Sequence, residues 1–265
     1  MAADRRPGGP NETAVAPCYR PGMELHSEWL GRTDYRVAWE RQHALVAARA
    51  AGRLPDQLML VEHDPVLTLG RNASPAHVRA NAELLAGRGI EIIRVERGGE
   101  VTYHGPGQLV AYPIVHLAQR GLLLRPFVRA MELAMVDTAA SYGVQAMRRE
   151  GFPGCWSAID DGRPRKLGAL GLRVERGVSY HGIALNVTTS LADFELIDPC
   201  GLPDIEVTSI SHEAGWSATA ARPSTQSVAE AAGRFEAAFR RRLDDAAGES
   251  ARLSHERRPV VAGAA

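Results

Sequence analysis

Apolar and polar residues follow two different spacings along the chain, and each spacing predicts its own kind of element. Where apolar side chains recur every three or four residues, they share one face of a helix. Pro126 suits the first turn of such a helix, because its backbone has no N–H to satisfy there, and Gly52 suits a helix end. This spacing predicts helices over residues 33–52, 81–85, 126–142 and 228–243.

Short apolar or alternating runs bounded by turn residues predict strands. An Asp-Asp-Gly turn and an Arg-Gly turn divide residues 155–187 into three runs typical of a meander, and a His-Asp-Pro turn separates two earlier runs. Strands grouped in hairpins, rather than in repeated strand–helix units, predict an α+β fold with a mixed sheet and packed helices. The predicted strands cover residues 58–61, 66–69, 90–95, 109–115, 155–159, 167–174, 178–187 and 207–210.

The composition, 45% hydrophobic and 23% charged, is that of a soluble globular protein. We expect a flexible leader over residues 1–22, one domain over 23–245 and a flexible tail over 246–265. The leader lacks a secretory signal, and no apolar run is long enough to span a membrane. Basic and acidic side chains balance at 31 each, so no net charge draws the chain to nucleic acid. Three scattered cysteines indicate a reducing cytoplasm.

The segment from Arg97 to Gln108 contains four glycines and a proline. Glycines let a backbone pass close to a ligand, but they are also the ordinary residues of a tight turn. Neither phosphate-binding template fits, because the segment has no GxxxxGK[ST] and no GxGxxG that opens a helix. Its polar side chains, which include Thr102 and His104, exceed what a turn needs and favour a binding loop. For His104, a structural role that pins the loop stays open beside a catalytic one.

Lys166 stands in an otherwise apolar, glycine-spaced stretch, RKLGALGLR. Lysine is seldom buried unpaired, so one interpretation is a solvated strand end beside Arg163 and Arg165. On a buried face, the ammonium would instead lie near an anion and could take part in proton transfer. The later stretch HGIALN, which begins at His181, supplies small residues against which an alkyl chain could lie.

Cys200 lies in the motif Asp-Pro-Cys-Gly. A lone cysteine is more often a small buried residue than a nucleophile. The flanking proline and glycine predict a turn and therefore some exposure, which strengthens the case for a nucleophile only modestly. Cys18 falls in the leader and Cys155 begins a strand, so we interpret both as bystanders.

The segments RGGEVTYHGPGQ, RKLGALGLR, SYHGIALNV and PCG with a nearby VTSI together resemble the lipoate-pathway octanoyltransferases. These are the octanoyl-[acyl-carrier-protein]:protein N-octanoyltransferases. EHDPVLTLGR also resembles their early strand pair. The resemblance covers about residues 25–215, with the order and spacing of the motifs intact. It implies the fold of biotin and lipoate protein ligases, and an octanoyltransferase catalytic domain over residues 23–245.

The resemblance also implies roles for the residues at matching positions. Cys200 matches the acyl-accepting thiol and Lys166 matches its partner. Asp198 stands where many relatives have asparagine. The residues implied to cradle the acyl group form three stretches, which are Arg97, Gly98, Gly99, Glu100, Val101, Thr102, Tyr103 and His104, then Ala169, Leu170 and Gly171, and finally Gly182, Ile183 and Ala184.

The implied reaction moves an octanoyl group from octanoyl-acyl carrier protein, through a thioester on Cys200, to a specific lysine of lipoyl domains in lipoate biosynthesis. The implied acceptors are lipoyl domains of 2-oxoacid dehydrogenase complexes and the glycine cleavage H protein, with no cofactor or metal. We expect no nucleic-acid or membrane partner. We also expect a monomer, because no long exposed apolar stripe is evident. The resemblance further implies that both protein partners are commonly acidic. Seven arginines could therefore form a positive rim or be merely solvated, namely Arg71, Arg148, Arg149, Arg163, Arg165, Arg173 and Arg176.

Three other interpretations of the function stay open. An ATP-dependent lipoate or biotin protein ligase on the same fold would activate a free acid as an adenylate and leave the PCG motif idle. A cysteine-dependent amidotransferase that moves octanoyl between proteins would use the same kind of chemistry. An acyl-binding or lipoyl-domain-binding module without activity is disfavoured, because Lys166 and Cys200 are both present.

Overall fold

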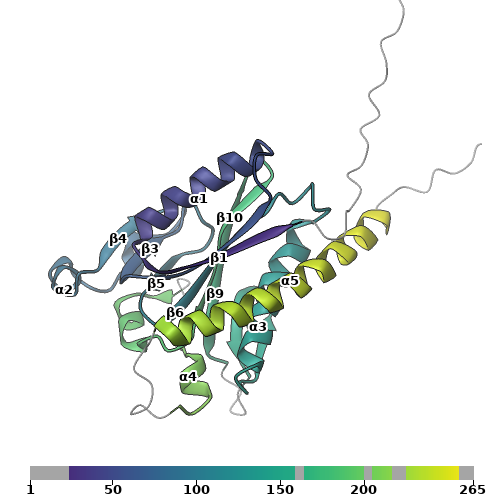
Figure 1. Cartoon of the computed structure of the whole chain (residues 1–265). Coiled ribbons are helices and arrows are strands. Elements are labelled where there is room, and N and C mark those ends of the chain that lie inside the picture. Colours follow the sequence, from purple (N-terminus) through teal and green to yellow (C-terminus); the bar gives the residue numbers. More distant parts are fainter. Residues whose placement is uncertain (1–23, 159–163, 200–204, 217–224, 257–265) are drawn as a thin grey trace, which may run out of the picture.

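The computed structural model describes residues 24–158, 164–199, 205–216 and 225–256 (Figure 1). Cys200 therefore lies outside the described residues, as do Cys18, Arg163 and the Asp-Asp-Gly turn. The expected leader and the last part of the expected tail, residues 257–265, also lie outside them.

A seven-stranded mixed sheet forms the body of the molecule. β1 and β2 run parallel because the helix α1 (Tyr35–Ala50) connects them, while the other neighbouring strands are antiparallel. β8, β9 and β10 follow one another as hairpins, which confirms the predicted meander. The spatial order is β1 (Leu25–Thr33), β2 (Asp56–His63), β6 (Gln108–Ile114), β10 (Val178–Asn186), β9 (Lys166–Glu175), β8 (Phe152–Ser157) and β7 (Ala146–Arg149).

A second, three-stranded sheet has the order β4 (Glu91–Arg94), β3 (Val66–Leu69) and β5 (Val101–His104). β3 and β4 are parallel, and the chain between them includes a short 3-10 helix, η1 (Pro75–His77), and α2 (Ala82–Gly87). The strands β2 and β3 follow each other across the predicted turn but belong to different sheets. The glycine-rich segment is also more than a loop, because β5 lies inside it and pairs with β3.

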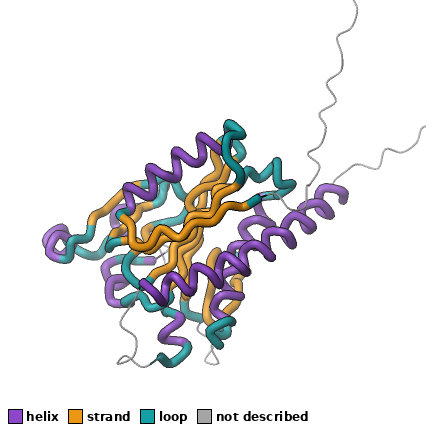
Figure 2. Tube along the Cα trace, viewed as in Figure 1, coloured by secondary structure: helices purple, strands orange, loops and turns teal. Residues whose placement is uncertain are grey.

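The two faces of the large sheet are buried under different helices, as Figures 1 and 2 show. Leu58 and Leu60 of β2 pack with α3 (Leu124–Ala140) and α5 (Thr225–Glu256), whereas Met59 and Val61 pack with α1. This division follows from the alternation of side chains along a strand. Because both faces are covered, the central strands consist of nearly continuous apolar residues.

The strand predicted over residues 207–210 is wrong. Val207 makes a single parallel bridge with Lys166, and the helix α4 (Ile210–Glu213) begins directly afterwards. Ser209 ends the extended stretch because its hydroxyl accepts a hydrogen bond from the His212 backbone N–H, at 3.2 Å, and so caps the helix. Ile210 is fully buried in the main core, which holds the helix in place.

The last helix is longer than predicted. α5 continues to Glu256, so the flexible tail expected from residue 246 is wrong up to that residue. Ala246 and Ala247 are buried in the core between α3 and α5, and the Ser250 hydroxyl accepts a hydrogen bond from the Leu123 N–H at 3.0 Å. Among the residues that the structure describes, no helix combines the length and the apolar character needed to cross a bilayer.

Candidate active site

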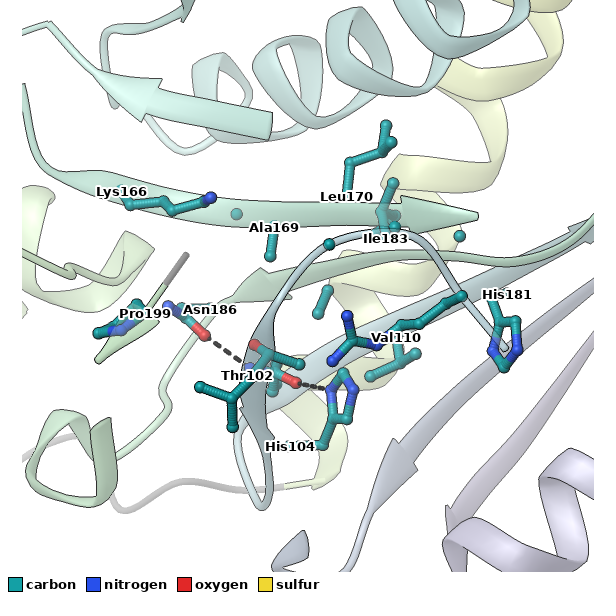
Figure 3. Close-up of a pocket in the computed structure, with 18 of the residues that line it drawn as sticks. Thr102, His104, Val110, Lys166, Ala169, Leu170, His181, Ile183, Asn186 and Pro199 are labelled. Carbon is teal, nitrogen blue, oxygen red and sulfur yellow. Dashed lines mark hydrogen bonds between the residues drawn. The ribbon is translucent and has the colours of Figure 1, made fainter. Parts of the chain in front are cut away.

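A pocket opens where β9 and β10 of the large sheet meet the segment around β5 (Figure 3). It encloses about 760 Å³, including solvent at its mouth. Ala169, Leu170 and Ile183 line it together with Val110 of the central strand β6. The lining is therefore largely apolar, although polar side chains such as Gln108 and Asn186 also line it.

Twelve of the fourteen residues predicted to cradle an acyl group line this pocket. Gly98 and Tyr103 do not. The Gly98 N–H donates to the Leu172 carbonyl at 3.1 Å, which ties the loop to β9. The Tyr103 hydroxyl donates to Asp193 at 2.8 Å, and its ring packs against Phe194. Those that do line it are Arg97, Gly99, Glu100, Val101, Thr102, His104, Ala169, Leu170, Gly171, Gly182, Ile183 and Ala184.

Two glycines directly opposite each other, Gly171 of β9 and Gly182 of β10, allow the backbone to pack closely here. A Cβ on Gly171 would lie 2.6 Å from the carbonyl oxygen of Gly98. A Cβ on Gly182 would lie 2.2 Å from the carbonyl oxygen of Ala111. Real Cβ atoms do not approach that closely, so only glycine lets the loop of Arg97 lie against β9.

Lys166 and Pro199 line one end of the pocket, close to Asn186 (Figure 3). Lys166 is only 8% exposed. Its backbone N–H donates to the Glu206 carbonyl at 2.7 Å, and its carbonyl accepts from the Thr208 N–H at 2.9 Å. The described chain on both sides of residues 200–204 therefore reaches the pocket end that holds Lys166, although Cys200 itself lies outside the described residues.

The chain before position 200 is fastened to the region of the small sheet. η2 (Leu191–Leu196) ends at Ile197, which bridges to Val78, and the Asp198 N–H donates to the His77 carbonyl at 2.8 Å. The Asp198 carboxylate forms an ion pair with Arg79. These contacts fix the chain as far as Pro199.

A buried hydrogen-bond chain runs along one side of the pocket (Figure 3). The Gln108 side-chain oxygen accepts from His104 Nδ1 at 2.7 Å, and the Gln108 amide donates to Asn186 Oδ1 at 2.9 Å. Asn186 in turn donates to the Thr208 carbonyl at 2.9 Å. Burial holds the pKa of His104 well below its usual value, so its imidazole is neutral and acts as a donor to Gln108.

The opposite end of the pocket is lined by Tyr35, Arg97, Tyr112 and His181. Burial raises the pKa of Tyr35 to about 12 and lowers that of His181, so both side chains are uncharged at neutral pH. Arg97 donates to the Thr68 carbonyl at 2.6 Å and to the Gly98 carbonyl at 3.0 Å. No local sequence pattern singles out Tyr35, Tyr112 or His181 for this role, because their position depends on how α1 and β6 pack against β10.

Cys155 shows the features of a structural cysteine. It is fully buried in the main core, and burial raises the pKa of its thiol to about 12. At neutral pH the group is therefore a thiol, which is a poor nucleophile. Among the described residues, no three His, Cys, Asp or Glu side chains are grouped so that they could hold a metal ion.

Comparison with known proteins identifies the family. Residues 34–239 match the lipoyl protein ligase A/B catalytic domain. The chain is 48% identical over 199 residues to an octanoyltransferase of Acidobacterium capsulatum, a match that covers 72% of this chain and 81% of that protein. An octanoyltransferase of Desulfotalea psychrophila is 44% identical over 187 residues, which cover 70% of this chain and 82% of that one. The chain belongs to the octanoyltransferase family.

This member of the octanoyltransferase family shares its fold with lipoate protein ligases. A bi-partite lipoate protein ligase from Thermoplasma acidophilum aligns with a TM-score of 0.60 at 16% sequence identity, covering 86% of this chain and 92% of that chain. At this level of identity the likeness shows the fold alone. The predicted α+β fold with a mixed sheet and packed helices is confirmed.

Proposed function

We propose that the chain transfers an octanoyl group from octanoyl-acyl carrier protein to a lysine of lipoyl domains, through a thioester on Cys200, in a reducing cytoplasm. The observation that carries the proposal is that Pro199, the residue directly before Cys200, lines the same pocket as Lys166. Membership of the octanoyltransferase family supports the choice of acyl group and reaction.

The pocket suits a medium-length acyl chain. Ala169, Leu170, Ile183 and Val110 offer it an apolar lining. Each methylene group removed from water contributes about 0.8 kcal/mol, so the six methylenes of an octanoyl group contribute up to about 5 kcal/mol. We therefore assign the apolar part of the pocket to the alkyl chain, and the end near Lys166 to the thioester.

In the first half-reaction, the Cys200 thiolate attacks the carbonyl carbon of the octanoyl thioester. The carbon–sulfur bond to the carrier protein breaks, and the departing carrier thiolate takes a proton from the Lys166 ammonium, which leaves Lys166 neutral for the second half-reaction. A neighbouring Lys166 ammonium favours the thiolate form of Cys200. One thioester replaces another, so this step is nearly balanced in free energy and requires no ATP.

In the second half-reaction, the ε-amine of a lipoyl-domain lysine attacks the thioester on Cys200. The amine loses a proton as the amide bond forms, and we assign Lys166 as the base that accepts it. Conversion of a thioester to an amide is downhill, which makes transfer to the acceptor effectively one-way. The buried position of Lys166 at the pocket end supports this role.

Intact mass spectrometry tests the proposal directly. The protein is mixed with octanoyl-acyl carrier protein in the absence of ATP, and we expect the mass to increase by one octanoyl group. Cys200→Ser should abolish the adduct, whereas Cys155→Ala should retain it, because the buried Cys155 thiol with its raised pKa does not react. Cys18→Ser should also retain it, because the proposal assigns the acyl group to Cys200. Addition of a lipoyl domain should then move the octanoyl group to the acceptor.

Two results would contradict the proposal. If the wild-type protein gains no octanoyl group without ATP but modifies the lipoyl domain when ATP and free octanoate are supplied, it is a ligase. If an adduct forms equally well in Cys200→Ser, the acyl group resides on another residue and the assigned nucleophile is wrong.

A further inference from the structure

Trp156 lies beside the lysine that the proposed reaction uses. It pairs with Lys166 across the β8–β9 ladder, and Lys166 Nζ lies 5.2 Å from the centre of the indole ring. From β7, on the other side of β8, the guanidinium carbon of Arg149 lies 4.7 Å from the same ring. One aromatic side chain thus contacts a cation from each neighbouring strand.

The surroundings of Trp156 are unusual for a core tryptophan. It is 1% exposed and is among the largest fully buried side chains in the described part of the chain. Nevertheless, it belongs to none of the four apolar clusters formed by the described residues. Its ring lies beside the two cations and Phe152, which meets it edge-on at 6.2 Å between centres. Burial of apolar surface alone does not account for this arrangement.

The tryptophan is itself held in one orientation. Its indole N–H donates to the Phe152 carbonyl at 3.0 Å, within the same strand. Gly154, two residues earlier, has a φ of +129°. A Cβ on Gly154 would lie 3.4 Å from Lys166 Cε and 2.4 Å from the Gly168 carbonyl oxygen. Gly154 of β8 therefore leaves space for the Lys166 side chain, and Trp156 of the same strand places its ring beside the Lys166 amino group.

We propose that Trp156 is a positioning residue, whose ring face holds the Lys166 ammonium at the pocket end. The negative face of an indole ring attracts a cation, and this attraction is strongest when both groups are shielded from water. A lysine side chain has many rotamers, so an aromatic face that favours one of them places the amine for proton transfer. This inference rests on the proposed function, in which Lys166 acts on Cys200 and on the incoming amine.

The first test compares variants at Trp156 with a neighbouring control. Pre-formed octanoyl-enzyme is mixed with a lipoyl domain, and the single-turnover transfer rate is measured against pH. We expect Trp156→Leu to lower the maximal rate by about tenfold, and Trp156→Phe, which keeps an aromatic face, to lower it much less. Phe152→Leu is the matched control, because Phe152 packs against Trp156 but has no recorded contact with Lys166, and its rate should stay near that of the wild type.

The second test preserves the shape of the side chain. Mono-, di- and trifluorotryptophan are incorporated at position 156, since fluorine withdraws electron density from the ring face without removing the ring. We expect the pH at which transfer reaches half its maximal rate to fall stepwise with each fluorine, because the ring favours the ammonium less. The same analogues at Trp29, a β1 residue packed on the main core, should leave this pH unchanged.

The outcomes separate the inference from the proposed function. Failure of the unsubstituted protein to form an octanoyl-enzyme would overturn the proposed function and the inference with it. If the unsubstituted protein transfers octanoyl but fluorination at position 156 leaves the pH profile unchanged, only the inference is overturned. The same holds if Trp156→Leu and Phe152→Leu slow transfer equally, because Trp156 would then have a merely structural role.

Discussion

At the scale of single residues, the pocket has two buried imidazoles in its lining, His104 and His181, and a third, His63, beside the His104 ring. Burial lowers the pKa of His63 to about 4 and also lowers those of His104 and His181. His63 is held by two hydrogen bonds of 2.8 Å, one with the Tyr112 hydroxyl and one with the Thr33 carbonyl. The folded protein therefore keeps these rings neutral at a pH at which an exposed histidine already begins to gain a proton.

These buried imidazoles predict how stability depends on pH. In the unfolded chain a histidine has its usual pKa of 6.5, so between about pH 6.5 and 4 the unfolded state binds more protons than the folded state. The stability that the neutral buried imidazoles contribute is therefore complete above about pH 6.5 and is lost as the pH falls toward about 4. Each imidazole contributes at most about 1.4 kcal/mol per pH unit.

Urea unfolding at a series of pH values measures this effect. We expect the free energy of unfolding to decrease from about pH 7 to about pH 4.5, and His63→Gln to make the decrease shallower. His255→Gln on the exposed end of α5 is the control and should leave the slope unchanged. An equal slope in wild type and His63→Gln would show that His63 does not contribute.

The sequence could predict a place at the pocket for some of its lining residues but not for others. The resemblance of the motifs around Ala169 and Gly182 to those of octanoyltransferases implied that both lie near an acyl chain, and both line the pocket. Tyr35 was assigned only to a helix. Its position at the pocket depends on packing between elements distant in the sequence, and no local pattern records that packing.

At the scale of elements, the pocket depends on close contact between β9 and the loop that precedes β5. Gly171→Ala would place a Cβ 2.6 Å from the Gly98 carbonyl oxygen, so the loop must move away from β9. We expect this variant to form the octanoyl-enzyme at least about tenfold more slowly, because a displacement of about 1 Å in a site can cost far more than that.

Gly233→Ala is the matched control for this substitution. Gly233 lies inside α5, and a Cβ there would meet nothing within 4 Å. Alanine favours the helix over glycine by about 1 kcal/mol, so the control should raise the melting temperature and leave acylation unchanged. Octanoyl-enzyme formation at the wild-type rate in Gly171→Ala would contradict the assigned role of this contact.

Local signals explain which elements the sequence could predict. The helices α1, α2 and α3, the first part of α5 and the β8–β10 meander were found because caps, turns and periodicity lie within each segment. The separation of β2 and β3 into two sheets was not found, because sheet membership depends on distant partners. Residues 207–210 contain the β-branched residues of a strand, but Ser209 caps a helix there, and Ile210 is buried by tertiary packing.

The extension of α5 gives a further prediction. Deletion of residues 246–265 would remove the buried Ala246 and Ala247 and leave the Leu123 N–H without the Ser250 hydroxyl. We expect a loss of about 2 kcal/mol or more in the free energy of unfolding, measured by urea denaturation. Deletion of residues 257–265 alone is the control, because it keeps Ala246, Ala247 and Ser250 in place. Equal stability of both truncated proteins would contradict the packing role of this last part of α5.

At the scale of the whole molecule, balanced charge does not exclude a local basic surface. Some of the arginines considered for a rim already have partners within the chain, because Arg148 pairs with Glu132 and Arg165 pairs with Glu213. Arg149 lies over the Phe152 and Trp156 rings. Arg71 is exposed and follows β3, and its backbone N–H bonds to the Arg97 carbonyl at the loop that lines the pocket.

This distribution predicts how salt affects the two protein substrates of the proposed reaction. Exposed charges are screened at physiological ionic strength, so the KM values for acyl carrier protein and lipoyl domain should both rise as salt increases. Arg71→Gln should reduce this salt dependence, whereas Arg241→Gln, exposed on α5, should not. Steady-state kinetics at several salt concentrations measures both effects, and KM values that stay flat would rule out recognition through a basic rim.

The strand order of the large sheet determines when the site can exist during synthesis. β6 lies between β2 and β10, so its second neighbour is complete only after the ribosome has released residues as far as Asn186. The pocket then needs Val207, and α5 covers the sheet last of all. A nascent chain therefore keeps the edge of β6 open until most of its length has emerged, because its decisive contacts are distant in sequence. Translation must be nearly finished before the pocket proposed for the acyl chain is complete.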